Sequence, residues 1–209
     1  QPETHQRFID LHSRLNAGDP DSLAKPLGEN LADMACEIID QIFGQMVQIA
    51  KSPDSESEKV IQHIIETTRK YMPWSVSLFG NERLMPMVNY LHRMTYTHDG
   101  DVFVRYPVEK MLVMELLGCV DQMKTGNHQY VSPAVKAFTQ VVDQGVTCLI
   151  REPKNLLKFN VVVDKTLTGV IHLTTQLGYK RIEKVSTQFD FIHAQKTLIH
   201  FFSFLEQPS

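Results

Sequence analysis

The sequence predicts an all-α fold: a multi-helix bundle of about seven helices, preceded by a short N-terminal helical arm. Two observations lead to this prediction. Apolar residues recur at three- and four-residue steps in most segments, which is the period of an amphipathic helix. Runs of glycine, proline, serine and asparagine separate those segments, whereas strand-like runs are short and have no obvious partner.

The N-terminal segment is expected to form the arm. Over residues 4–15, Phe8, Leu11 and Leu15 share one side of a short helix. Residues 16–21 are almost all turn formers, and Pro26 and Gly28 are expected to extend the loop. We therefore expect residues 1–28 to be an arm and linker, and 29–209 to be one helical domain.

The segment 31–49 carries the strongest helical pattern. Its apolar stripe predicts that Ile38 and Ile42 are fully buried, while acidic and amide side chains occupy the other face. The next helix is expected to begin near Ser55, whose spacing to Glu58 fits a capping box. Pro73 is expected to end that helix.

The remaining segments continue the helical pattern, with one interruption. Residues 74–80 are expected to be a connector, 97–101 a turn, and 102–104 briefly extended. The helix at 107–123 is apolar on nearly all sides, which predicts a position at the centre of the bundle. The last helices are expected over 132–152, 154–177 with Gly178 as the C-cap, and 181–206.

Composition and charge exclude several classes of protein. The chain has 209 residues, of which 43% are hydrophobic, and a net charge of −3, so it is not a disordered chain. Residues 1–50 carry 3 basic and 8 acidic side chains, and 151–209 carry 8 and 5. No dense basic stripe results, so we expect no nucleic-acid partner. No stretch approaches ~18 uninterrupted apolar residues, so we expect no membrane span.

The three cysteines indicate a reducing compartment. Cys36, Cys119 and Cys148 each lie in an apolar, helix-like stretch, and none forms a C-x-x-C pair. This usage is typical of buried, reduced thiols, and it predicts a cytoplasmic protein.

The short motifs that could carry chemistry are weak. His98 and Asp99 resemble a metal-binding pair, with His63 and Asp164 as possible partners, but they fall in a turn where we expect a solvated histidine. Asp190 and His193 give only one half of the motif that a di-iron bundle needs. No catalytic or metal-ligating residue is predicted, and the cofactor is left open.

The C-terminal run 198–205 is the surface that we single out. Six of its eight residues are large and apolar, and they cover most of the circumference of a helix. Either the fold encloses this end of the helix, or part of it forms an interface between two copies. We predict the interface residues Leu198, Phe201, Phe202 and Leu205.

Together, these observations predict a non-enzymatic helical protein that binds a partner protein or an apolar small ligand, as a homodimer. The alternative is a helical metal-dependent enzyme of the hydrolase or oxygenase class. Its groups would come from separate helices, with His92, His172, His193 and Asp164 as candidates. A third interpretation is the effector domain of a transcriptional regulator without its DNA-binding head, because the acidic first quarter argues against that head being present.

Overall fold

The computed structural model describes residues 1–44, 55–188 and 191–202, and most of them are helical. The main helices are α1 (Pro2–Asn16), α2 (Ala24–Ile39), α4 (Ser55–Val76), α5 (Asn81–Met94), α6 (Lys110–Lys124), α7 (Val131–Val146), α8 (Glu152–Leu157), α9 (Val161–Gln188) and α10 (Phe191–Phe202). Shorter helical turns cover Asp40–Gly44, His128–Tyr130 and Thr147–Arg151. Within the described residues the only strands are the pair β1 (Thr95–His98) and β2 (Asp101–Val104). The predicted all-α class is therefore confirmed.

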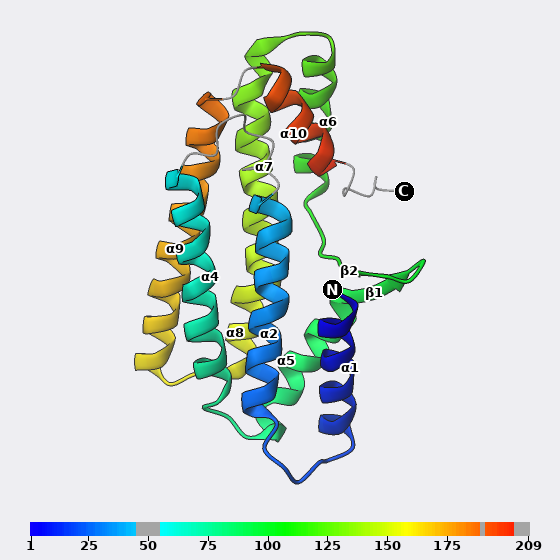
Figure 1. Cartoon of the computed structure of the whole chain (residues 1–209), viewed down its shortest axis with the longest axis vertical. Coiled ribbons are helices and arrows are strands. Elements are labelled where there is room, and N and C mark those ends of the chain that lie inside the picture. Colours follow the sequence, from blue (N-terminus) through cyan, green and yellow to red (C-terminus); the bar gives the residue numbers. More distant parts are fainter. Residues whose placement is uncertain (45–54, 189–190, 203–209) are drawn as a thin grey trace.

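The long helices run side by side along the longest axis of the molecule. Helices α2, α4, α7 and α9 form this central part, with α1, α5 and α8 at the end where α2 begins (Figure 1). Helices α6 and α10 lie at the opposite end, against α7. Two clusters of buried apolar side chains result, one toward each end.

The first cluster is built on the N-terminal helices. Phe8, Leu11 and Leu15 of α1 are buried as the sequence predicts, together with side chains from α2, α4, α5 and α8. The Asn30 side chain donates to the Thr4 carbonyl at 2.9 Å, which adds a buried polar contact between α1 and α2. Helix α1, part of the segment expected to be an arm, thus contributes to this core.

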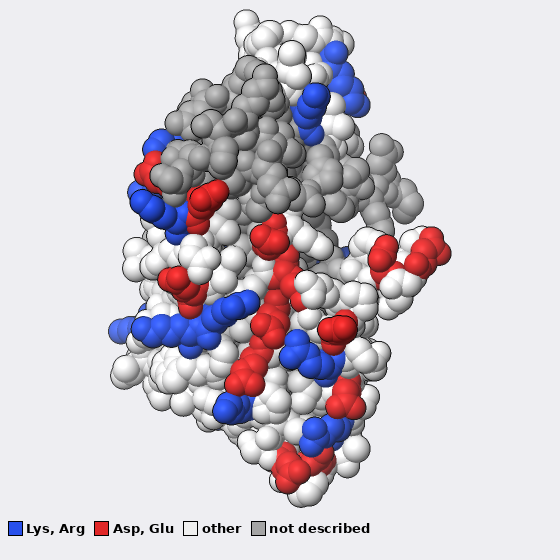
Figure 2. Space-filling view, viewed as in Figure 1, with Lys and Arg blue, Asp and Glu red and all other residues white. Residues whose placement is uncertain are grey.

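The outer face of α2 is acidic, as its sequence pattern predicts. Acidic side chains on α2, at steps of three and four residues, form a row along the molecule (Figure 2). Helix α1 docks against part of this row. The Thr4 hydroxyl donates to Glu37 at 2.5 Å, and Arg7 pairs with Asp33 at 3.3 Å.

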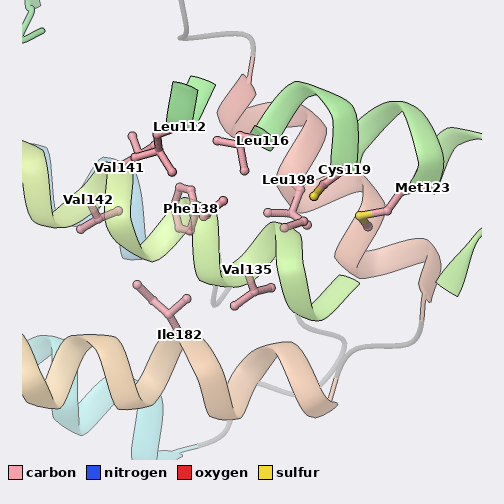
Figure 3. Packing of buried hydrophobic residues seen from close by; sticks show 12 residues of the cluster. Leu112, Leu116, Cys119, Met123, Val135, Phe138, Val141, Val142, Ile182 and Leu198 are labelled. Carbon is pink, nitrogen blue, oxygen red and sulfur yellow. The ribbon is translucent and has the colours of Figure 1, made fainter. Parts of the chain in front are cut away.

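The second cluster joins four helices. Leu116 and Met123 of α6, Phe138 of α7, Ile182 of α9 and Leu198 of α10 point into one interior (Figure 3). All five are buried, so α10 is held to the bundle by its inner face.

Two helices extend past residues that were expected to end them. Helix α4 continues beyond Pro73 to Val76, and Val76 is buried against α2. Helix α9 continues through Gly178 to Gln188, where the sequence predicts a C-cap at Gly178. Gly178 is buried next to Ile64, so tertiary packing outweighs the low helix propensity of glycine there.

Another two expectations about helix position are wrong. Helix α2 begins at Ala24, so Pro26 and Gly28 lie within it instead of in a loop. The predicted helix over 154–177 is divided, because Lys158 adopts a left-handed conformation with φ +50° and separates α8 from α9.

Predicted burial also differs from the structure in two places. Helix α6 is not central, since Met111 and Met114 on its outer face are exposed and only its inner face packs on α7 and α10. Ile38 and Ile42, expected to be fully buried, are half-buried.

The antiparallel pair of strands is a hairpin that leaves the bundle at the end of α5 (Figure 1). Its turn has Asp99 at φ +51° and Gly100 at φ +85°, which is the pattern of a two-residue hairpin turn. The sequence correctly predicts the turn and the extended residues 102–104, but it misses the partner strand. That strand has Tyr96 stacked on Phe103 at 5.3 Å between ring centroids.

Candidate interaction surface

Of the four residues predicted to form an interface, the structure describes the side chain of one. Leu198 is 4% exposed and lies between α6 and α7, so it belongs to the interior of the chain (Figure 3). Phe201 and Phe202 lie in α10, but their side chains are outside the described residues, as is the whole of Leu205. The outer face of α10 exposes Ile192 and Ile199.

A longer apolar face lies on α9. Local contacts determine where this helix begins. The Asn160 side chain accepts a hydrogen bond from the backbone amide of Val163 at 3.0 Å, which is the contact of an N-cap residue. Asp164, in the first turn, pairs with Lys154 of α8. The helical backbone is interrupted at Lys158, which is left-handed, and these contacts stabilise the first turn of the helix that follows and runs to Gln188.

The inner side of α9 is fixed to the bundle by apolar and polar contacts. Leu167 and Ile182 are buried. The Tyr179 hydroxyl donates to Asp143 of α7 at 2.6 Å, and Arg151 pairs with the same carboxylate at 2.8 Å. Burial and this hydrogen bond raise the pKa of the Tyr179 hydroxyl, so the tyrosine stays neutral and the contact persists at neutral pH.

With the inner side held, the outer side of α9 presents an apolar row, which we call the α9 stripe. It consists of Val162, Thr166, Gly169, Leu173 and Leu177, at steps of four, three, four and four residues. Val162 is 75% exposed, Leu173 66% and Leu177 40%. Such steps place all five on one side of a helix, so the α9 stripe is a continuous exposed band.

Small residues lie in the middle of the stripe. A Cβ atom built on Gly169 would meet no heavy atom within 4 Å. Thr166 is exposed and donates its hydroxyl to the Val162 carbonyl at 2.9 Å, which satisfies that hydroxyl within the helix. The centre of the stripe therefore has small side chains and is accessible to another molecule, with bulkier apolar side chains toward its two ends.

The rim of the stripe is polar. Lys165, His172 and Gln176 are exposed along one edge, and Lys180 is exposed beyond Leu177 at the C-terminal end of the stripe. An apolar centre with a polar rim is the usual anatomy of a protein–protein interface.

The stripe is large enough to matter energetically. The exposed parts of Val162, Leu173 and Leu177 are equivalent to about two fully exposed residues, so burying them stabilises a complex by roughly 3–6 kcal/mol per copy. Association itself costs roughly 4–15 kcal/mol. A complex formed through two such stripes is thus expected to be weak to moderate and dependent on concentration.

The structure does not bring together the three candidates for a metal-dependent enzyme whose side chains it describes. His92 lies on α5 in a stack with His12 of α1, Asp164 is paired with Lys154, and His172 is exposed on α9. The side chain of His193 is outside the described residues. Among the side chains that are described, no group of three or more His, Cys, Asp or Glu residues is placed to hold a metal ion.

Sequence reasoning did not anticipate the histidine stack, because its members are far apart in the chain. The His12 and His92 rings lie 4.1 Å apart between centroids with 9° between their planes, and Asn89 lies 2.9 Å from His12 Nε2. Burial, followed by the nearby His12 and His5, lowers the pKa of His92. Burial and the N-terminal ammonium group lower the pKa of His5. This stack joins α1 to α5 and favours the neutral form of His92.

The His98–Asp99 pair is a surface feature of the hairpin, as predicted. The two side chains are 3.4 Å apart and both are exposed to solvent. His63 lies on α4, also exposed, so it does not complete a buried site with them.

No protein-family model, curated protein or solved structure matches this chain. Across the described residues, no helix is both long and apolar enough to cross a membrane.

Proposed function

We propose that this chain is a non-enzymatic helical protein of the cytoplasm that binds protein partners and acts as a homodimer. The observation that carries the proposal is the α9 stripe, an exposed apolar face on a helix whose other side is firmly packed. Its polar rim and its length along α9 fit another protein surface better than a small apolar molecule, which would favour an enclosed cavity.

The cysteines support the proposed compartment. Cys36 and Cys119 are buried and Cys148 is half-buried, and all three are free thiols. Burial raises the pKa of each thiol, which lowers its reactivity. Free, poorly reactive thiols are typical of proteins in reducing compartments.

Light scattering coupled to size-exclusion chromatography tests the homodimer. We expect the mass to rise toward twice the 24.0 kDa of one chain as protein concentration increases through the micromolar range. A mass of one chain at every concentration up to about 100 μM would overturn the proposal, since that corresponds to an association weaker than about 5–6 kcal/mol.

A further inference from the structure

We infer that a second copy of this chain covers the α9 stripe, with the two α9 helices antiparallel about a two-fold axis beside Gly169. This inference rests on the proposed homodimer and assigns it an interface and a register. It differs from the interface predicted at the C-terminal run, of which Leu198 is turned into the interior and the other three side chains lie outside the described residues.

The spacing of the stripe is complementary to itself when reversed. With the axis between Gly169 and Val170, Val162 lies opposite Leu177 of the second copy, and Thr166 lies opposite its Leu173. Each bulky Leu173 then faces a small threonine, which is how a side chain fits between those of a neighbouring helix. The same two contacts occur twice because a two-fold interface uses one surface from each copy.

Gly169 allows the helices to approach at the axis. No heavy atom of the chain lies within 4 Å of its Cβ position, so nothing in the monomer fills that space. Two helices packed 8–10 Å apart bring facing Cα atoms at the axis to within roughly 3–5 Å, given a backbone radius of about 2.3 Å.

Charge favours the antiparallel arrangement over a parallel one. In a parallel pair, Lys165 would lie near Lys165 of the second copy, and the same holds for Lys180. The antiparallel register instead places Lys165 level with Thr174 of the second copy, where the same edge of the stripe carries that copy's His172 and Gln176. The dipoles of the two helices then also oppose each other, which is favourable.

The competing face on α10 gives less support for a second copy. Ile192 and Ile199 are exposed there, but several neighbouring side chains are outside the described residues. The α9 stripe, by contrast, has described side chains at all of its positions and a self-complementary spacing.

Disulfide crosslinking tests the register directly. Single cysteines are introduced at exposed positions in the full chain, oxidised mildly and resolved on non-reducing gels, with the unaltered chain as the baseline for its native thiols. A disulfide forms only where the two Cα atoms come within about 7 Å. We expect Gly169→Cys to crosslink to itself. Val162→Cys should crosslink when mixed with Leu177→Cys, but not alone.

Gly118→Cys is the matched control. Gly118 is also an exposed helical glycine with no heavy atom within 4 Å of its Cβ position, but it lies on α6. Gly118→Cys should crosslink no more than the unaltered chain does. Efficient self-crosslinking of Val162→Cys would overturn the antiparallel register. A dimeric protein in which neither Gly169→Cys nor the mixed pair crosslinks would overturn the α9 interface but leave the homodimer standing. A chain that is monomeric would overturn both the α9 interface and the homodimer.

Discussion

Gly28 allows α2 and α4 to approach closely, so adding one methyl group there should destabilise the fold. A Cβ atom at this position would lie 2.7 Å from Pro73 Cα and 3.2 Å from Val76 Cβ. The nearer atom belongs to the backbone of α4, so no rotation of a side chain can relieve the contact. Overpacking of this kind costs roughly 1–3 kcal/mol, whereas alanine gains about 1 kcal/mol over glycine in a helix.

For Gly28→Ala we therefore expect a net loss of up to about 2 kcal/mol in the free energy of unfolding. Urea unfolding followed by far-UV circular dichroism measures it, at a fixed protein concentration so that association does not change the comparison. Gly118→Ala on α6 is the control, because its Cβ meets nothing within 4 Å and it should gain about 1 kcal/mol. If both variants became more stable by the same amount, the close approach of α2 and α4 would be refuted.

Three other predictions follow from burial and ionisation. Leu116→Ala, at a fully buried position of α6, should cost about 2–5 kcal/mol in urea unfolding, whereas Met114→Ala on the exposed face should change stability by less than about 0.5 kcal/mol. Because the pKa of His92 is lowered in the folded chain, the unfolded chain binds more protons below its ordinary value of 6.5, so stability should fall as the pH falls through this region. His92→Gln should reduce that slope in unfolding measured from pH 7.5 to 5, and an unchanged slope would exclude this role. Cys36 and Cys119 should react slowly with a thiol reagent in the native chain and rapidly in denaturant, and fast native reaction would contradict their burial.

The sequence predicts helix content well because the apolar periodicity is strong. The buried faces of α1 and α7 were correctly predicted at Phe8 and Phe138, for example. Helix ends were predicted less well, because Pro73 and Gly178 are local stop signals that packing between helices overrides. Such packing depends on residues far apart in the chain and leaves no local pattern.

Of the interface predicted at the C-terminal run, the structure decides only the position of Leu198. The run is apolar around most of a helix, which led to that prediction, and Leu198 is enclosed by α6 and α7. On α9, the buried side and the exposed stripe both carry apolar residues at helical spacing, so periodicity alone does not tell which of them faces the core. A second apolar row at Val162 and Leu173 was the available signal. The stack of His12 on His92 had no comparable signal, because eighty positions separate the two residues.

Sedimentation velocity on two matched variants tests the α9 interface most directly. Leu173→Glu places a charge within the α9 stripe, and Ile199→Glu places one on the exposed face of α10. If α9 joins the two copies, Leu173→Glu sediments as a folded monomer at concentrations where the unaltered chain and Ile199→Glu sediment as dimers. A dimeric Leu173→Glu together with a monomeric Ile199→Glu would contradict the α9 interface and return it to the C-terminal helix.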